Sequence, residues 1–326
     1  MIRIGILGAA RIAPKAVIKP ASLREDCIVT AVAARDAVKA GAYAAEHGIP
    51  HALTDYDALV THAEVDLVYN ALPNNRHADL SIAALEAGKA VLCEKPFAMN
   101  AAEAESMIDA AHRTGGILIE AFHYRFHPAF LRVEEIVKSG ILGPLHTIEG
   151  DFTAEIPYRD GELRHTLALG GGALMDLGCY PLHMARTLAD AEPQILSAHC
   201  TGDRPGVDLA TTAKLAFPND VTADIQTNMA PGAKFNVYLK ADCADGSVSL
   251  TNPVHPHRGH RIEIHKDGKT LVDTEEGLTT YDYQLAHVLD VMKGEASPLT
   301  GGADAIGNMA AIDAIYTAAG YAPRGT

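Results

Sequence analysis

The sequence predicts an α/β protein: a doubly wound parallel sheet followed by an α+β domain. From the start to about Ala121, apolar runs without polar alternation are separated by Ala-rich amphipathic stretches, as in parallel strands covered by helices on both faces. After Arg125, strand-like segments follow one another without long helices, and some alternate, as in residues 214–217. A chain of 326 residues can bury two cores, so we expect two domains, residues 1–122 and 123–326.

Each element follows from these patterns in chain order. The first domain is expected to contain the strands Ile2–Leu7, Cys27–Ala34, Asp66–Asn70, Ala90–Glu94 and Ile117–Ala121. Its expected helices are Val38–Glu46, His77–Glu86 and Ala101–Arg113. The later helices are expected at Pro128–Ser139, from the Gly-rich stretch Gly170–Gly172 to about Leu188, at Tyr281–Met292 and at Ala303–Ala319. The later strands are expected at Leu145–Thr153, Gln194–Thr201, Asp208–Phe217, Val221–Asn228, Phe235–Ala241, Ser247–Leu250, Arg261–His265 and Thr270–Asp273.

Composition and charge exclude several classes of partner. The formal net charge of −14 argues against nucleic acid and anionic membranes, because neutralising phosphates requires a basic face. No apolar run reaches the roughly 20 residues of a membrane span, and no signal peptide is visible at the start. The five cysteines are odd in number and widely spaced, so we expect reduced thiols and a cytoplasmic protein.

The ends of the first two strands bear on nucleotide binding. The stretch ILGAARIA keeps one glycine, Gly8, of the three in the dinucleotide fingerprint, with Ala10 and Ala13 at the other positions. By itself it is either a phosphate-binding turn or a plain junction of strand and helix. The second strand ends in Ala34 and Arg35, a small residue and a cation. If a dinucleotide binds, a cation there favours NADP, although the carboxylate of Asp36 keeps NAD possible.

Two other strand ends carry polar residues. The strand that begins at Ala90 must stop at Pro96, which leaves Lys95 at the mouth of the crevice where doubly wound sheets bind ligands. A surface lysine at a strand end is an equally good interpretation. Asn75 and His77 follow the strand that ends at Asn70. Such residues either cap the next helix or border a nucleotide.

The stretch GGGALMDLGCYPLH, Gly170–His183, is the most informative. Three glycines permit a tight turn before a helix, and Asp176, Tyr180 and His183 then recur at the spacing of one helical face. The alternative is structural, because Asp176 could merely complement the helix dipole. The histidine-rich segment 255–260 lacks a recognisable ligand pattern and contains Pro and Gly. It predicts a solvated loop, and no metal site is expected.

The chain resembles the Gfo/Idh/MocA oxidoreductase family, especially the branch with dimeric dihydrodiol dehydrogenase and related sugar dehydrogenases. The resemblance covers nearly the whole length. It implies an N-terminal Rossmann domain and a C-terminal domain with a large, mostly antiparallel open sheet that commonly mediates dimer formation. The stretches that carry it are Ile6–Ala13, Ala33–Asp36, Leu72–His77 (LPNNRH), Glu94–Phe97 (EKPF), Glu120–Pro128 (EAFHYRFHP) and Gly170–His183.

The resemblance also implies a role for each matched residue. Lys95 would be the EKP lysine beside the nicotinamide, Tyr180 the proton donor or acceptor, and Asp176 a residue that helps to hold the substrate. The implied cofactor-binding residues are Gly8, Ala10, Arg11, Ile12, Ala34, Arg35, Leu72, Pro73, Asn75, His77, Glu94 and Lys95. The implied substrate-binding residues are Tyr124, Arg125, Phe152, Asp176 and His183.

The implied chemistry is an NADP-preferring dehydrogenase or reductase of a sugar, polyol or vicinal diol, with NAD possible. A free tyrosine has a pKa of about 10, too high for an efficient base at neutral pH. An ammonium about 4 Å away contributes roughly 4 kcal/mol at an effective dielectric constant of about 20, or about three pKa units. Lys95 could therefore bring Tyr180 into range and also stabilise an alkoxide.

Two other functions fit the same fold. One is a non-catalytic nucleotide-binding sensor or regulator, against which the joint retention of Lys95, Asp176 and Tyr180 argues. The other is an enzyme that retains its nicotinamide cofactor for net non-redox chemistry, such as glycoside cleavage. The downstream motifs favour the interpretation of ILGAARIA as a turn that binds the pyrophosphate. Alanines at positions 10 and 13 are small enough for the close approach of a cofactor.

Overall fold

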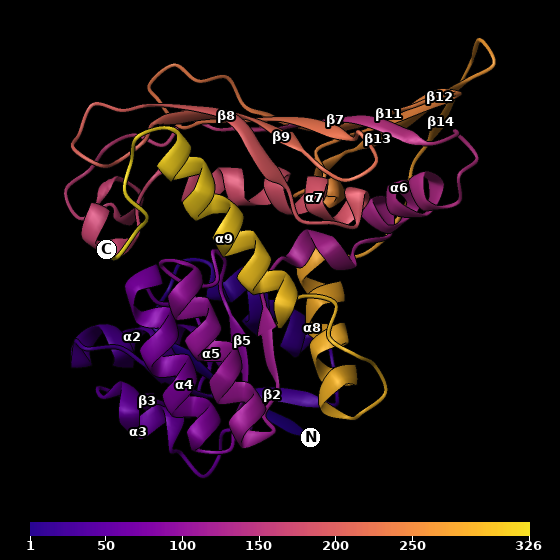
Figure 1. Cartoon of the computed structure of the whole chain (residues 1–326). Coiled ribbons are helices and arrows are strands. Elements are labelled where there is room, and N and C mark those ends of the chain that lie inside the picture. Colours follow the sequence, from indigo (N-terminus) through magenta and orange to yellow (C-terminus); the bar gives the residue numbers. More distant parts are fainter. The chain divides into compact units, whose positions relative to one another are not determined.

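The computed structural model describes all residues, Met1–Thr326, and the chain forms two compact units (Figure 1). Unit 1 comprises Met1–Phe122 and Tyr281–Ile306, and unit 2 comprises His123–Thr280 and Gly307–Thr326. The chain passes from unit 1 to unit 2 between residues 122 and 123, and Tyr281–Ile306 return to unit 1. The reason is apolar packing within unit 1, described below.

Unit 1 is built on a sheet of six parallel strands in the order β3-β2-β1-β4-β5-β6. Its strands are β1 (Ile2–Leu7), β2 (Cys27–Ala33), β3 (His51–Leu53), β4 (Leu67–Asn70), β5 (Ala90–Cys93) and β6 (Leu118–Glu120). The parallel, doubly wound sheet expected from the apolar runs is confirmed. The sequence did not predict β3, because three partly exposed residues give no periodic signal.

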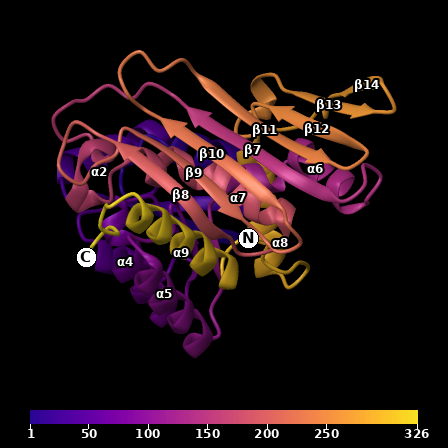
Figure 2. The same cartoon turned by 45° about the horizontal axis from the view of Figure 1, so that its top comes forward.

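Helices flank this sheet in both views (Figures 1 and 2). They are α1 (Lys19–Ser22), α2 (Ala37–His47), α3 (Tyr56–Val60), α4 (His77–Glu86), α5 (Ala101–Thr114) and α8 (Thr280–Met292), with the start of α9 (Ala303–Ala318). The buried side chains of Leu285, Val288 and Leu289 on α8 join the same apolar core as Ile4 and Ile6 of β1. This shared core explains why α8 belongs to unit 1.

Unit 2 contains a sheet of eight strands in the order β14-β13-β12-β11-β7-β10-β9-β8. Its strands are β7 (Leu145–Thr153), β8 (Gln194–Thr201), β9 (Ala210–Ala216), β10 (Thr222–Asn228), β11 (Asn236–Cys243), β12 (Gly246–Thr251), β13 (Arg261–Lys266) and β14 (Lys269–Asp273). All neighbouring pairs are antiparallel except β7 and β10, which are parallel. The expectation of a large, mostly antiparallel sheet is therefore confirmed.

One face of this sheet is covered and the other is open. Figure 1 shows α6 (Pro128–Lys138) and α7 (Cys179–Ala189) on the same side of the sheet. Along β9 the side chains of Ala213 and Leu215 are buried, whereas Thr212 and Lys214 are exposed on the other face. This alternation is what a sheet with one apolar and one solvated face requires.

The structure contains no helix long and apolar enough to cross a membrane. All five cysteines are buried, and none forms a disulfide.

A side-chain cap at the start of α5 provides a stability test. Asn100 accepts a hydrogen bond at its Oδ1 from the backbone N of Glu103, at 3.0 Å. We expect Asn100→Ala to lower the free energy of unfolding by about 1 kcal/mol, because a backbone N–H at the helix start loses its partner. Urea unfolding followed by circular dichroism measures the change. Asn100→Asp, which keeps an acceptor oxygen, should stay within a few tenths of a kcal/mol of wild type; equal losses in both variants would contradict the capping role.

Candidate active site

The carboxyl ends of the parallel strands in unit 1 hold the first group of predicted site residues. Gly8 follows β1 with a φ of +91°, a conformation that favours glycine. A Cβ at this position would lie 3.0 Å from Leu72 Cδ2, so a side chain would crowd the loop that follows β4. The backbone carbonyl of Ala10 accepts a hydrogen bond from the Tyr43 hydroxyl of α2 at 3.0 Å. The turn is thus narrow and fixed, and it fits the close approach of a pyrophosphate.

At the end of β2, Arg35 and Asp36 have different surroundings. Asp36 caps α2, with its Oδ1 accepting a hydrogen bond from the backbone N of Lys39 at 2.9 Å. Ala34 is buried, and Arg35 is exposed beside it. The carboxylate that could bind a ribose diol is therefore engaged by a helix, while the cation faces solvent.

The loop after β4 is held by buried polar groups. Asn70 donates from Nδ2 to Ser81 Oγ at 3.1 Å and to the carbonyls of residues 76 and 77. His77 is fully buried, with Nε2 at 2.9 Å from the Leu72 carbonyl oxygen and Nδ1 at 3.0 Å from that of Pro96. Burial lowers the pKa of His77, while the two carbonyl partners act in the opposite direction. His77 thus connects the loops after β4 and β5, whereas Asn75 beside it is exposed.

Beyond β5 lie Glu94 and Lys95, both partly exposed. The Tyr69 hydroxyl of β4 donates to Glu94 Oε1 at 2.5 Å, and the backbone N of Lys95 donates to Glu94 Oε2 at 3.3 Å. The Lys95–Pro96 peptide bond is cis. Glu94 therefore fixes the backbone from which the Lys95 side chain extends.

In unit 2, Tyr180 lies in the first turn of α7 and is almost fully buried. Its hydroxyl is 3.1 Å from His123 Nε2, and His123 Nδ1 is 2.8 Å from Thr280 Oγ1. When Nδ1 carries the proton and donates to Thr280, Nε2 accepts the Tyr180 O–H. The Phe152 ring packs at 5.4 Å between centroids from Tyr180 and shields it on one side.

The other aromatic and basic residues predicted for the substrate region are also buried. Tyr124 and His183 form a hydrogen bond of 2.5 Å between the hydroxyl and Nδ1. The Tyr124 ring lies 5.8 Å between centroids from both Tyr180 and His183, so these two α7 side chains share a face of the helix. Arg125 instead pairs with Glu134 of α6 at 2.7 Å, which holds the segment before α6 against that helix.

Asp176 lies in a π-helical turn, Leu174–Gly178, that leads directly into α7. Its Oδ2 accepts a hydrogen bond from Arg164 Nε at 2.7 Å, and Arg164 also pairs with Glu162 at 3.0 Å. The nearby Asp176 carboxylate raises the pKa of the Arg164 guanidinium. Arg164 thereby fixes the position of Asp176 and occupies one of its oxygens.

Sequence reasoning missed the two polar partners of this region. His123 belongs to the EAFHYRFHP motif and could have been selected from it, but nothing in the sequence connects Arg164 with Asp176. The loop His255–His260 packs His255 against His123, with ring centroids 5.7 Å apart. No three His, Cys, Asp or Glu side chains in the structure are grouped to hold a metal ion.

Comparison with known proteins matches residues 2–122 to the oxidoreductase family with an NAD-binding Rossmann fold, GFO_IDH_MocA. Residues 130–267 match the GFO/IDH/MocA C-terminal domain. Among curated proteins, the chain is 32% identical over 319 residues to D-xylose 1-dehydrogenase (NADP(+)) 2 of Haloferax volcanii, covering 97% of this chain and 96% of that protein.

Two solved structures are similar along almost the whole chain. Aldose-aldose oxidoreductase from Caulobacter crescentus, complexed with glycerol, has a TM-score of 0.89 and 27% identity, and the match covers 98% of this chain and 97% of that one. KijD10, a 3-ketoreductase from Actinomadura kijaniata complexed with NADP and TDP-benzene, has a TM-score of 0.87 and 25% identity, and the match covers 97% of each chain. With both of its domains matched and a full-length relative above 30% identity, the chain belongs to the Gfo/Idh/MocA family of nicotinamide-dependent oxidoreductases.

Proposed function

We propose that this enzyme is an NADP-preferring dehydrogenase or reductase of a sugar, polyol or vicinal diol. The observation that carries the proposal is the buried Tyr180 hydroxyl at 3.1 Å from His123 Nε2, because it is a proton-transfer group already paired with an imidazole. The names of two similar proteins, an NADP-dependent xylose dehydrogenase and an aldose-aldose oxidoreductase, support the substrate class. The NADP complex of the 3-ketoreductase supports the cofactor.

Unit 1 provides the residues that would hold the cofactor. A side chain at Gly8 would crowd Leu72, and the narrow turn fits a pyrophosphate. Arg35 is exposed beside the engaged Asp36 and would pair with a 2′-phosphate. The other residues proposed to line the cofactor site are Ala10, Arg11, Ile12, Ala34, Leu72, Pro73, Asn75, His77, Glu94 and Lys95.

The protein's own groups supply the proton chemistry. When bound, the nicotinamide supplies the hydride acceptor or donor. In the oxidation direction Tyr180 passes its own proton to His123 Nε2, which becomes an imidazolium, as it takes the proton of the substrate hydroxyl. Lys95 stabilises negative charge on the reacting oxygen. Asp176, held in place by Arg164, accepts hydrogen bonds from substrate hydroxyls, and Tyr124, Arg125, Phe152 and His183 shape the pocket.

We also propose that the enzyme works in the cytoplasm, because none of its five buried cysteines forms a disulfide.

The first test is turnover of NADP and NAD with aldoses, inositols and vicinal diols. We expect Lys95→Met and Tyr180→Phe each to reduce kcat by about 100-fold or more, because each removes a group that acts on the reacting oxygen. Cofactor binding, measured by the fluorescence of NADPH, should stay within a few-fold of wild type.

The matched controls are Lys269→Met on β14 and Tyr56→Phe on α3, which should turn over at the wild-type rate. Full turnover by Lys95→Met or Tyr180→Phe would contradict the assignment. Tight cofactor binding by the wild type without turnover of any substrate class would instead favour a sensor.

Cofactor preference depends on Arg35. We expect Arg35→Ala to weaken NADP binding by about 10- to 100-fold, since a charge-assisted hydrogen bond contributes about 1.5–3 kcal/mol. NAD binding should change little. Titration of both cofactors checks this, with Arg113→Ala as the matched arginine control in the same unit. Equal weakening of NADP and NAD would show that Arg35 does not read the 2′-phosphate.

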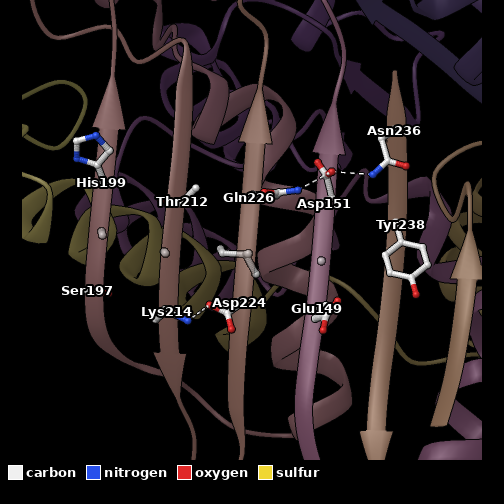
Figure 3. A pocket seen from close by; sticks show the side chains of 14 residues that line it. Glu149, Asp151, Ser197, His199, Thr212, Lys214, Asp224, Gln226, Asn236 and Tyr238 are labelled. Carbon is white, nitrogen blue, oxygen red and sulfur yellow. Dashed lines mark hydrogen bonds and ion pairs between the residues drawn. The ribbon is translucent and has the colours of Figure 1, made fainter. Parts of the chain in front are cut away.

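We further propose that the open face of the unit 2 sheet mediates a homodimer or a higher homo-oligomer. This face contains a hollow of about 400 Å³ lined by side chains of β7 to β11 (Figure 3). Asp151 is held there by Gln226 at 2.8 Å and Asn236 at 2.7 Å, and Lys214 pairs with Asp224 at 2.6 Å. Ordered side chains of both charge signs suit a face that pairs with a copy of itself.

In solution we therefore expect a mass at least twice that of one chain. Lys214→Glu should raise the dissociation constant of the oligomer by about 10-fold or more, because it places like charges beside Asp224. Sedimentation velocity over a concentration series measures this, with Lys269→Glu, outside the hollow, as the control. A wild-type monomer at micromolar concentration, or equal weakening by both variants, would refute this interface.

A further inference from the structure

A fully buried ion pair joins the segment after α9 to the interior of unit 2. Arg324 Nη2 lies 2.9 Å from Asp208 Oδ1, and both side chains have no exposed surface. The Tyr316 hydroxyl of α9 donates to the same oxygen at 2.7 Å, and the Arg324 guanidinium stacks 3.9 Å from the centre of the Tyr316 ring. We call these three residues the Asp208 cluster.

The hydrogen bonds of the cluster are well satisfied. Asp208 Oδ2 accepts from the Thr211 hydroxyl and from the backbone N of Leu174, both at 2.8 Å. Arg324 Nε donates to the Gly171 carbonyl at 2.8 Å. Burial and the Asp208 carboxylate raise the pKa of Tyr316, which keeps its hydroxyl protonated as a donor. A buried ion pair costs much desolvation energy, so such complete pairing is needed for it to persist.

Three backbone partners of the cluster lie at one place, the Gly-rich turn before the helix of Asp176 and Tyr180. The Asp208 carbonyl accepts from the backbone N of Ala173 at 2.9 Å, and its carboxylate accepts from Leu174. These two amides open the helical segment that continues into α7. Asp208 therefore caps this segment and places a negative charge at the positive end of the helix dipole.

Gly172 shows how closely the turn fits the cluster. Its φ is +140°, and a Cβ there would lie 2.2 Å from Asp208 Oδ1, 2.6 Å from Arg324 Nη2 and 2.7 Å from Tyr316 Oη. The Gly172 carbonyl also accepts from the backbone N of Asp176 at 3.0 Å. A displacement of the cluster would therefore move Gly172 and, through this hydrogen bond, the backbone of Asp176.

We propose that Arg324 is a positioning residue for catalysis: acting through Asp208, it fixes the start of the helix that carries Asp176 and Tyr180. This inference rests on the proposed roles of those two residues. Because the cluster lies wholly in unit 2, it should affect kcat and the KM of the substrate without affecting the binding of a cofactor held by unit 1.

The test compares Arg324→Ala with wild type and with Arg261→Ala, an exposed arginine of β13 in the same unit. We expect Arg324→Ala to lower kcat by about 10- to 100-fold, since a small misplacement of a catalytic group has an effect of this size. The dissociation constant for NADPH should remain within twofold, and Arg261→Ala should match wild type. Millimolar guanidinium should restore part of the kcat of Arg324→Ala, whereas ammonium at equal ionic strength should not.

A second readout does not depend on turnover. Hydrogen–deuterium exchange of residues 172–178 should accelerate about 10-fold or more in Arg324→Ala, because the amide of Leu174 loses its fixed acceptor. If the wild type proves inactive, the proposed function fails, and this exchange still tests the positioning role. Unchanged exchange in Arg324→Ala, or a folded variant with wild-type kcat, would overturn the inference.

Tyr316→Phe covers the case in which Arg324→Ala does not fold. It removes one hydrogen bond to Asp208 but keeps the ring beneath the guanidinium. We expect a several-fold loss of kcat, with NADPH binding unchanged and faster exchange over residues 172–178. A Tyr316→Phe enzyme with wild-type kcat and wild-type exchange would refute the positioning role.

Discussion

The common direction of the strands in unit 1 is the constraint on which the rest of the site depends. Buried parallel strands all end at one edge of their sheet, so their following loops meet there although they are far apart in sequence. Gly8, Arg35, Asn75 and Lys95 follow β1, β2, β4 and β5 in this way. The protein needs no specific interaction to gather them, because the sheet itself does so. Specific hydrogen bonds, such as those of His77 and Glu94, only set the shape of each loop.

Unit 2 positions its proposed site residues in a different way. Most of its neighbouring strands run in opposite directions, so no single edge collects the proposed site residues. Apart from Phe152 on β7, these residues come from the helical segment 174–189 and from the segment before α6. Each of them is fixed by an individual partner: Tyr180 by His123, and Asp176 by Arg164. Positioning here depends on polar contacts that one substitution can remove, and this dependence underlies the role proposed for the buried Asp208 cluster.

These two ways of positioning side chains, by the sheet edge and by individual polar partners, explain which parts of the fold and of the candidate site the sequence could predict. The proposed roles of Lys95 and Tyr180 come from the resemblance of short motifs to a known family. Apolar runs and helical spacing predict most elements, since periodicity is local. They do not predict β3, which is too short, or the return of α8 to unit 1, which depends on contacts made only after folding. The sequence does not predict the roles of Arg164 and Arg324 for the same reason. Their partners Asp176 and Asp208 lie 12 and 116 residues away along the chain, and no sequence pattern links them.

The charges of unit 2 also bear on what it can bind. The guanidinium groups of Arg125, Arg164 and Arg324 pair with Glu134, Asp176 and Asp208 at 2.7, 2.7 and 2.9 Å. An anionic substrate group would have to compete with these carboxylates for a guanidinium, and separating the fully buried Arg324–Asp208 pair is especially costly. A neutral molecule with several hydroxyls needs only donors and acceptors, which Asp176, Tyr180 and their partners offer. If the substrate lies among these residues as proposed, the paired guanidinium groups favour a free sugar or polyol over a phosphorylated one.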